Sequence, residues 1–272
     1  MKRIHNSFRF SLFLLLILIS AMPSFLKAQI STQNLYERQL FIEGDDTLFC
    51  RILSPIHFSR SKKYPLIIVL HGSGERGNDN ESQLLWGSNL FLDSTNREKF
   101  PAIVVFPQCP ADSSWSVRIK NKAQDSANVF RFPMDAPATK PLQLVMNFID
   151  TLVNAGNVDS KRIYIGGLSM GGFGTFELLW RRPQLFAAAF PICGGGNPAS
   201  AKIYGKHFPI WVFHGADDDV VPIANSRTMV DALKTAGAKL KYTEYAGVKH
   251  DSWKNAFAEP ELLPWLFAQK KL

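Results

Sequence analysis

The chain has 272 residues, of which 46% are hydrophobic and 20% charged, and its formal net charge is +8. A chain of this size and hydrophobic content can bury a large core, which excludes an intrinsically disordered protein and fits a single α/β domain. Its densest basic cluster, Arg60, Lys62 and Lys63, is shorter than the basic stripe of a nucleic-acid-binding surface. We therefore expect a solvated loop there and no nucleic-acid partner.

The N-terminal segment has the organisation of a secretory signal peptide. A short basic region precedes an apolar run over residues 10–19, which is too short to span a bilayer comfortably. We predict a signal peptide over residues 1–28 with cleavage after Ala28, and cleavage near Ala21 or Ser24 is the alternative. The mature domain, residues 29–272, is then expected in the periplasm or outside the cell, without a stable membrane anchor.

Strands and helices are predicted to alternate along residues 29–272. Apolar and β-branched runs predict strands over residues 35–42, 47–53, 64–70, 102–106, 162–165, 187–190, 210–213 and 239–245. Helical spacing of apolar residues predicts helices over residues 142–152, 173–180 and 224–233, and a closing helix over 260–271. The first two strands are expected to form a hairpin, and the others a mostly parallel sheet with helices on both faces. Such α/β folds bind ligands at the carboxyl ends of their strands.

A G-x-S-x-G motif over residues 167–171 follows the predicted strand 162–165 and opens the predicted helix 173–180. A nucleophilic serine must stand clear of the backbone on a sharp strand-to-helix turn, and the crowded turn needs glycines on both sides. The motif therefore predicts Ser169 as a nucleophile, with an ordinary glycine-rich turn as the alternative.

A second glycine-rich loop, residues 71–77, follows the predicted strand 64–70. An acyl-transfer site needs fixed N–H donors for the developing oxyanion. The backbone N–H groups of Ser73 and Met170 are our candidates for this oxyanion hole. The alternative is a phosphate-binding loop, but the glycine spacing matches neither G-x-G-x-x-G nor a Walker motif.

Candidates for the base and the acid follow the last two predicted strands. A serine nucleophile needs an imidazole to take its proton and a carboxylate to orient that imidazole. His250 follows strand 239–245, and three adjacent aspartates, residues 217–219, follow strand 210–213. His214 could also be the base, although a His-Gly pair after a strand more often shapes a loop. Asp251 could instead cap the next helix.

Three cysteines remain after the predicted signal peptide: Cys50, Cys109 and Cys193. Cys50 lies in an apolar strand and is expected in the core. Cys109 and Cys193 follow strands at the same edge of the sheet, which leaves open a disulfide between them or free thiols. No C-x-x-C spacing occurs, so no metal and no cofactor are expected.

Together these motifs resemble the α/β-hydrolase superfamily, and within it the bacterial esterases and predicted peptidases of the phospholipase/carboxylesterase and dienelactone-hydrolase type. The resemblance rests on residues 70–77, 107–110, 167–172, 214–222 and 250–253. It implies a catalytic triad of Ser169, Asp218 and His250, because the family pattern His-Gly-x-x-Asp-x-x-Val-Pro places the acid on Asp218. The family's oxyanion position falls on Ser73.

Residues 109–141 depart from this resemblance, because they are longer and more polar than a simple strand-to-helix connection. Long loops often bind something. Trp115, Glu75 and Arg76 are our candidate substrate-binding residues, and a surface excursion packed by its own aromatic side chains is the alternative reading of 109–141. Too few residues separate Cys193 from Pro209 for a helical lid.

The sequence therefore predicts an exported serine hydrolase that cleaves carboxylic esters, either acyl groups on polysaccharides or small aryl or alkyl esters. A serine peptidase of the prolyl-oligopeptidase type, an acyltransferase and a non-catalytic binding domain are the alternatives. No stretch of this sequence accounts for the large propeller that gates such peptidases. No residue of the predicted triad is missing, which argues against the non-catalytic reading.

Overall fold

The computed structural model describes residues 35–120 and 130–271. The predicted signal peptide, residues 1–28, lies outside the described residues. Among the described residues, no helix combines the length and hydropathy needed to cross a bilayer.

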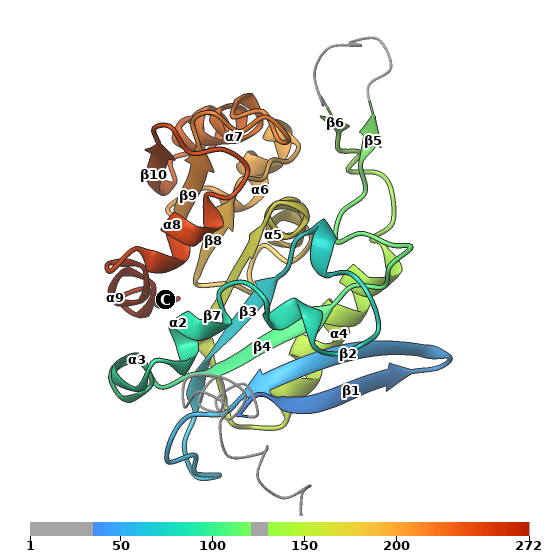
Figure 1. The fold of residues 1–272 in the computed structure, drawn as a ribbon, viewed down its shortest axis with the longest axis vertical. Coiled ribbons are helices and arrows are strands. Elements are labelled where there is room, and N and C mark those ends of the chain that lie inside the picture. Colours follow the sequence, from blue (N-terminus) through green and yellow to red (C-terminus); the bar gives the residue numbers. More distant parts are fainter. Residues whose placement is uncertain (1–34, 121–129, 272) are drawn as a thin grey trace, which may run out of the picture. The chain divides into compact units, whose positions relative to one another are not determined.

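Continuous apolar runs form the central strands of an eight-stranded sheet, as predicted (Figure 1). Its order is β1-β2-β4-β3-β7-β8-β9-β10, and all neighbours from β4 to β10 are parallel, whereas β1 and β2 form an antiparallel hairpin and β2 is antiparallel to β4. The strands are β1 (Glu37–Glu43), β2 (Asp46–Leu53), β3 (Tyr64–Leu70), β4 (Ile103–Gln108), β7 (Val158–Leu168), β8 (Ala188–Ile192), β9 (Pro209–Gly215) and β10 (Lys239–Tyr245).

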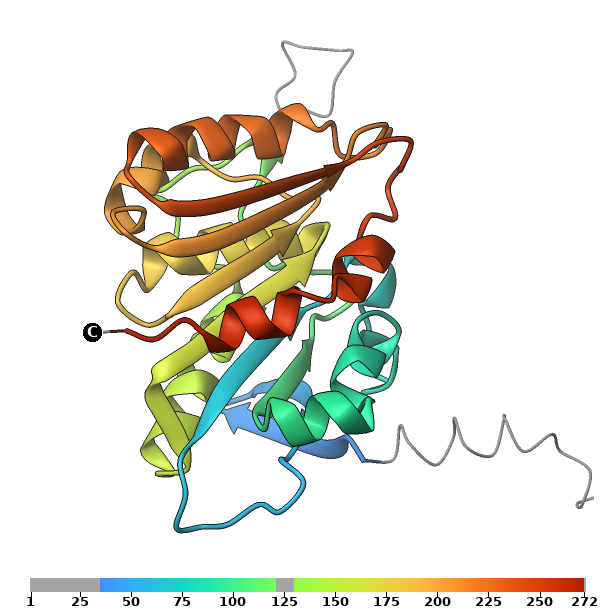
Figure 2. The ribbon, with the colours of Figure 1, turned by 90° about the vertical axis from the view of Figure 1, so that its left-hand side faces the viewer.

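The helices cover both faces of this sheet. One core contains apolar side chains of α4, α5 and α7, and the other contains those of α2, α8 and α9, which Figure 2 shows as teal and red helices on one face. The bounds are α2 (Ser88–Leu92), α3 (Ser94–Lys99), α4 (Lys140–Asn154), α5 (Met170–Arg181), α6 (Ala201–Tyr204), α7 (Ala224–Thr235), α8 (Trp253–Ala258) and α9 (Leu262–Phe267), with short 3-10 helices at Ser73–Glu75, Ser82–Leu84 and Pro198–Ser200.

Strand β3 shows why the central strands are apolar throughout. All of its residues are buried, and successive side chains point to opposite faces of a strand. Leu66 and Ile68 join the core under α4 and α5, whereas Ile67 and Val69 join the core under α2 and α9. The predicted α/β architecture with two covered faces is therefore confirmed.

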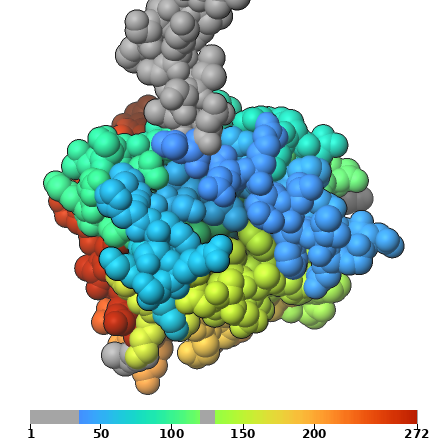
Figure 3. All heavy atoms as spheres, turned by 90° about the horizontal axis from the view of Figure 1, so that it is seen from below, coloured from blue at the N-terminus to red at the C-terminus, as the bar shows by residue number. Residues whose placement is uncertain are grey.

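The antiparallel hairpin lies beside α4. Figure 3 shows the blue hairpin next to the yellow-green helix. Asn147 of α4 donates its side-chain N–H to Glu43 at 2.6 Å, and Lys140 pairs with Asp46 at 2.6 Å. These contacts join α4 to the turn of the hairpin.

The predicted closing helix is wrong in its extent. Instead of one helix over residues 260–271, α8 is followed by the short helix α9, which ends at Phe267. The N–H of Lys271 donates to the carbonyl of Lys161 at 3.0 Å, so the last residues run along the sheet rather than continue the helix.

Candidate active site

Ser169 lies on the sharp turn between β7 and α5. Its backbone dihedrals are φ 52° and ψ −114°, a conformation that non-glycine residues rarely adopt and that is held only where the surroundings enforce it. A Cβ on Gly167 would lie 2.5 Å from the carbonyl oxygen of Gly171, and one on Gly171 would lie 2.0 Å from that of Leu70. The two motif glycines are therefore required by the close approach of three backbone segments.

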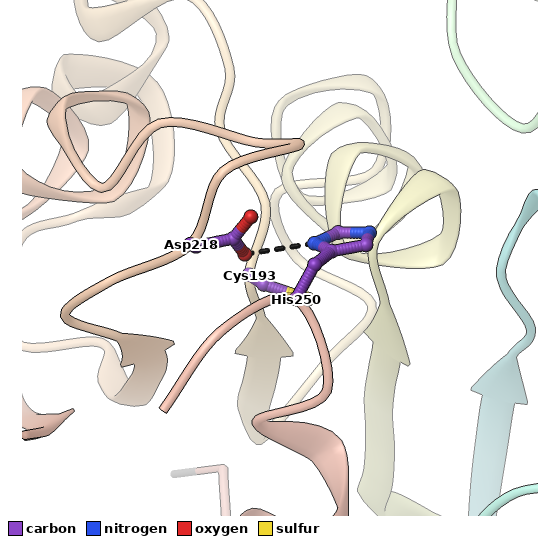
Figure 4. Close-up of side chains that lie close together, drawn as sticks. All are labelled: Cys193, Asp218 and His250. Atoms are coloured by element: carbon purple, nitrogen blue, oxygen red, sulfur yellow. Dashed lines mark hydrogen bonds and ion pairs between the residues drawn. The ribbon is translucent and has the colours of Figure 1, made fainter. Parts of the chain in front are cut away.

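A hydrogen-bonded chain joins Ser169, His250 and Asp218. Ser169 Oγ lies 3.0 Å from His250 Nε2. His250 Nδ1 lies 2.8 Å from Asp218 Oδ2, the contact drawn as a dashed line in Figure 4. Because a carboxylate only accepts, Nδ1 carries the proton and Nε2 is left as the acceptor that faces the serine hydroxyl. The three side chains that the sequence singled out thus meet in the geometry of a nucleophile, a base and an orienting acid.

The Asp218 carboxylate is fully buried and is held in its charged form. Burial alone would raise its pKa, but hydrogen bonds from His214, His250 and the backbone N–H of Val221 together lower the pKa below its usual range. The Oδ1 atom accepts the N–H groups of Val220 at 3.0 Å and Val221 at 2.8 Å. The loop after β9 therefore supplies a permanent negative charge beside His250.

The two flanking aspartates point elsewhere. Asp217 and Asp219 are exposed, and Asp219 pairs loosely with Lys249 at 3.6 Å. Asp251, next to His250, pairs with Lys254 at 3.0 Å and makes no side-chain cap for α8. Only Asp218 of residues 217–219 faces the histidine.

The two candidate oxyanion-hole N–H groups have no hydrogen-bond acceptor in the described part of the chain. Met170 is the first residue of α5, and neither its N–H nor that of Ser73 donates to a group within residues 35–120 and 130–271. A Cβ on Gly72 would lie 3.7 Å from Ser169 Cβ, so the loop after β3 passes directly beside the nucleophile. Both N–H groups therefore belong to backbone that adjoins Ser169 Oγ.

His71 shapes this loop. Its side chain is buried, its Nε2 accepts the N–H of Cys109 at 2.9 Å, and its Nδ1 donates to the carbonyl of Gly72 at 2.6 Å. Burial lowers the pKa of His71 to about 4, so the ring stays neutral and keeps this pattern at neutral pH.

Arg76 and Glu75 occupy different environments in the same loop. The exposed Arg76 donates to the carbonyls of Ser73 at 3.0 Å and Ser113 at 3.2 Å, so it braces the loop against the segment after β4. Glu75 is only 7% exposed, and burial raises the pKa of its carboxyl. Contact of Glu75 and Arg76 with substrate stays a prediction.

Trp115 corrects an expectation. It was a candidate substrate-binding residue, yet its side chain is fully buried and its indole N–H donates to the carbonyl of His71 at 3.1 Å. A Cβ on Gly174 would lie 2.5 Å from Trp115 Cβ, so the ring packs directly under α5. Trp115 supports the loop beside the nucleophile and offers no surface to a ligand.

The described residues of the long connection on either side of 121–129 contact α5. The connection carries a two-stranded ribbon, β5 (Ile119–Lys120) with β6 (Phe130–Arg131). The N–H of Val117 donates to Glu177 at 2.8 Å, and the Arg118 guanidinium lies 4.8 Å from the ring centre of Phe173 and 5.1 Å from that of Phe130. These contacts fit the alternative of an excursion packed by its own aromatic side chains.

Cys193 lies beside the acid and the base, which sequence reasoning missed (Figure 4). Its Sγ and the nearest ligand atoms of Asp218 and His250 lie within 4.8 Å of one another, a grouping that could suggest a metal site. The donor set does not fit one, because burial raises the pKa of the Cys193 thiol and keeps it protonated, whereas metals bind the thiolate. The Nδ1 atom of His250 and the carboxylate of Asp218 are also committed to each other.

All three cysteines are free and buried, so the possible disulfide between Cys109 and Cys193 is not formed. Cys109 follows β4 and Cys193 follows β8, and β3 and β7 lie between these strands. Three inter-strand steps separate them by about 14 Å, about twice the longest Cα separation that a disulfide spans.

This fold and this arrangement of serine, histidine and carboxylate at the ends of parallel strands define an α/β-hydrolase. Residues 53–260 match the model of one family within that class, described as Phospholipase/Carboxylesterase. The chain belongs to this family.

Several known proteins are similar to the chain. It is 30% identical over 158 residues to the bifunctional acetylxylan esterase/xylanase XynS20E of Neocallimastix patriciarum, an alignment that covers 58% of this chain and 20% of that protein. It is 26% identical over 198 residues to lysophospholipase-like protein 1 of Mus musculus, covering 68% and 79% of the two chains. The crystal structure of a thermostable esterase superposes with a TM-score of 0.78 at 36% identity, over 89% of this chain and 64% of that one. The chain thus spans about a fifth of the first relative and under two thirds of the esterase structure.

Proposed function

We propose that this protein is an exported serine esterase that cleaves carboxylic esters through an acyl-enzyme. The observation that carries the proposal is the hydrogen-bonded chain from Ser169 Oγ through His250 to Asp218, with contacts of 3.0 Å and 2.8 Å. This chain supplies the three parts that turn a serine hydroxyl into a nucleophile.

In the first half-reaction, Ser169 Oγ attacks the ester carbonyl carbon while His250 Nε2 takes the hydroxyl proton. The tetrahedral intermediate collapses as the bond from carbon to the alcohol oxygen breaks, and His250 returns the proton to that oxygen. In the second half-reaction, water attacks the acyl-enzyme, its proton passes to His250 and then to Ser169 Oγ, and the carboxylic acid leaves. Asp218 remains ionised throughout and stabilises the imidazolium.

The oxyanion of each tetrahedral intermediate would be bound by the N–H groups of Ser73 and Met170. Loss of one such donor typically weakens transition-state stabilisation by about 3 to 4 kcal/mol. Arg76 contributes indirectly, because it holds the Ser73 carbonyl and so fixes the peptide beside the donor.

Esters borne by polysaccharides, or small aryl or alkyl esters, are the substrates that we favour. An open depression of about 570 Å³ borders His250, and its lining comprises Gly247, Val248 and the polar residues Asp219, Lys249, Asp251 and Asn255. His250 must protonate the departing alcohol, so polar groups near it suit a hydroxyl-rich alcohol better than a lipid. The similarity to an acetylxylan esterase/xylanase supports the same class.

Export is proposed from the N-terminal sequence alone. Its basic region and apolar run are those of a signal peptide, and the mature enzyme would act in the periplasm or outside the cell. Fractionation of cells that express the full chain, with N-terminal sequencing of the mature protein, tests this part separately.

The activity is tested with chromogenic esters of increasing acyl length, an aryl-acyl ester, acetylated xylan and a peptide amide. We expect turnover of esters by the wild type and none by Ser169→Ala. Faster cleavage of the amide would favour a peptidase, and acyl transfer to an added alcohol in preference to water would favour an acyltransferase. No turnover of any substrate by the wild type would contradict the proposal.

A further inference from the structure

His214 lies at the end of β9, fully buried, four residues before the acid. Its Nε2 is 2.8 Å from the carbonyl oxygen of Val221 and 3.3 Å from Asp218 Oδ2. Its Nδ1 is 2.7 Å from Ser226 Oγ. Every polar atom of this ring is therefore engaged with the loop that carries Asp218 or with the helix that follows it.

The partners of Nε2 decide its protonation. A backbone carbonyl and a carboxylate oxygen are both acceptors, so Nε2 must carry a hydrogen. That single N–H points between Val221 and Asp218. Asp218 Oδ2, the oxygen that accepts from His250, thus has a second imidazole donor within reach.

The same ring fixes the turn that presents the carboxylate. Val221 accepts the His214 N–H through its carbonyl and donates its own N–H to Asp218 Oδ1 at 2.8 Å. The ring itself is held from the far side, because Ser226 of α7 also bonds to the carbonyl of Gly194, in the loop after β8. Three segments of the chain thus set the position of one imidazole.

We propose that His214 is a positioning residue that shares the Asp218 carboxylate with His250 and thereby sets the pH at which His250 works as a base. The inference rests on the proposed function, in which His250 is that base. Without the His214 N–H, the carboxylate would hold the proton of the His250 imidazolium more strongly. The rising limb of kcat/KM would then move to higher pH.

Glu244 and Cys193 are further titratable groups near these two histidines. Glu244 of β10 interacts with His214 and is already paired with Arg227 at 2.7 Å. The Cys193 thiol lies beside His250, and burial keeps it neutral. Asp218 is therefore the charge that couples the two imidazoles.

Two amide variants distinguish the contribution of Nδ1 from that of Nε2. His214→Asn can place an amide near Ser226 but cannot reach Asp218, whereas His214→Gln can place an N–H near the position of Nε2. For His214→Asn, we expect the midpoint of the rising limb of kcat/KM to lie about 0.5 to 1 pH unit above that of the wild type, as for the loss of one charge-assisted hydrogen bond. The limb of His214→Gln should stay at the wild-type midpoint.

The assay is the pH profile of kcat/KM with a p-nitrophenyl ester, together with thermal unfolding of each variant. A folded His214→Asn whose limb coincides with that of the wild type would overturn the inference, as would an equal shift in His214→Gln. If His214→Asn does not fold, Ser226→Ala replaces it, since a ring freed from Ser226 should give a smaller shift in the same direction, and an unmoved limb would refute the idea.

The control separates this inference from the function on which it rests. Full activity in Ser169→Ala would overturn the proposed function itself. Loss of activity in Ser169→Ala with an unmoved limb in His214→Asn would overturn only the role of His214.

Discussion

Replacement of Asp218 by asparagine tests the candidate triad most sharply, because the structure predicts how the amide would sit. The Oδ1 position accepts two backbone N–H groups, from Val220 and Val221. An asparagine would keep its carbonyl oxygen there and turn its NH₂ toward His250. A donor would then face Nδ1, so the imidazole would have to carry its proton on Nε2 and could not accept one from Ser169.

The expected loss follows from this wrong tautomer. Neutralisation of a triad acid typically lowers kcat by about 10⁴-fold, or about 5 kcal/mol of transition-state stabilisation. Asp217→Asn and Asp219→Asn are matched controls on exposed side chains. Loss of the exposed pair of Asp219 with Lys249 should change stability by less than about 1 kcal/mol. For a p-nitrophenyl ester, whose leaving group carries no hydroxyl groups for the depression beside His250 to bind, kcat should stay within about threefold.

The three variants are compared by kcat with a p-nitrophenyl ester and by thermal unfolding. Asp218→Asn should unfold cooperatively yet be nearly inactive. The reasoning would be refuted if Asp217→Asn were the most damaging of the three, or if a folded Asp218→Asn kept more than about a tenth of the wild-type kcat.

Three further predictions concern the nucleophile, the base and a buried acid. Ser169→Ala should retain the wild-type Tm and lose activity by several orders of magnitude, and an organophosphonate should label Ser169 in the wild type, as mass spectrometry of the labelled peptide would show. The kcat/KM of the wild type should rise with pH through one ionisation and then level off, because catalysis needs the neutral imidazole. His250→Ala should abolish both this rise and the rate, and a flat profile from about pH 5 to 9 would exclude His250 as the base. Burial raises the pKa of Glu75, so the folded state binds a proton that the unfolded state releases, and the contribution of Glu75 to stability falls as pH rises above its unfolded value. Denaturant titrations of Glu75→Gln should therefore show a gain over the wild type that is larger at about pH 8 than at about pH 5, and a gain independent of pH would contradict the shift.

The strands and the sheet could be predicted because their signal is local. The apolar run of β3 and the glycines around Ser169 are each required by their immediate surroundings, so the residue types alone reveal them. The same holds for His214, whose predicted role in shaping a loop agrees with its burial and its bonds to Val221 and Ser226.

The residues whose role or neighbours the sequence did not predict depend on contacts between distant segments. The polar loop around Trp115 predicted a binding residue. The position of Trp115 against α5 follows instead from packing between segments about 60 residues apart, which no local pattern encodes. The position of Cys193 beside Asp218 and His250 follows from the order of β8, β9 and β10 in the sheet. Sheet order also separates Cys109 from Cys193, although both follow strands that end at the same edge.

The three buried thiols bear on how the protein has to be produced. Burial raises the pKa of Cys109 to about 12 and those of Cys50 and Cys193 further, so oxidants find little thiolate in the folded chain. If the chain is exported, as we propose, it meets oxidants before its core has closed. A disulfide that Cys193 forms at that moment with Cys50 or Cys109 links residues that the native sheet keeps apart. The yield of active protein in an oxidising compartment thus depends on whether the core folds faster than the thiols are oxidised. A reductant present during refolding should favour the native form.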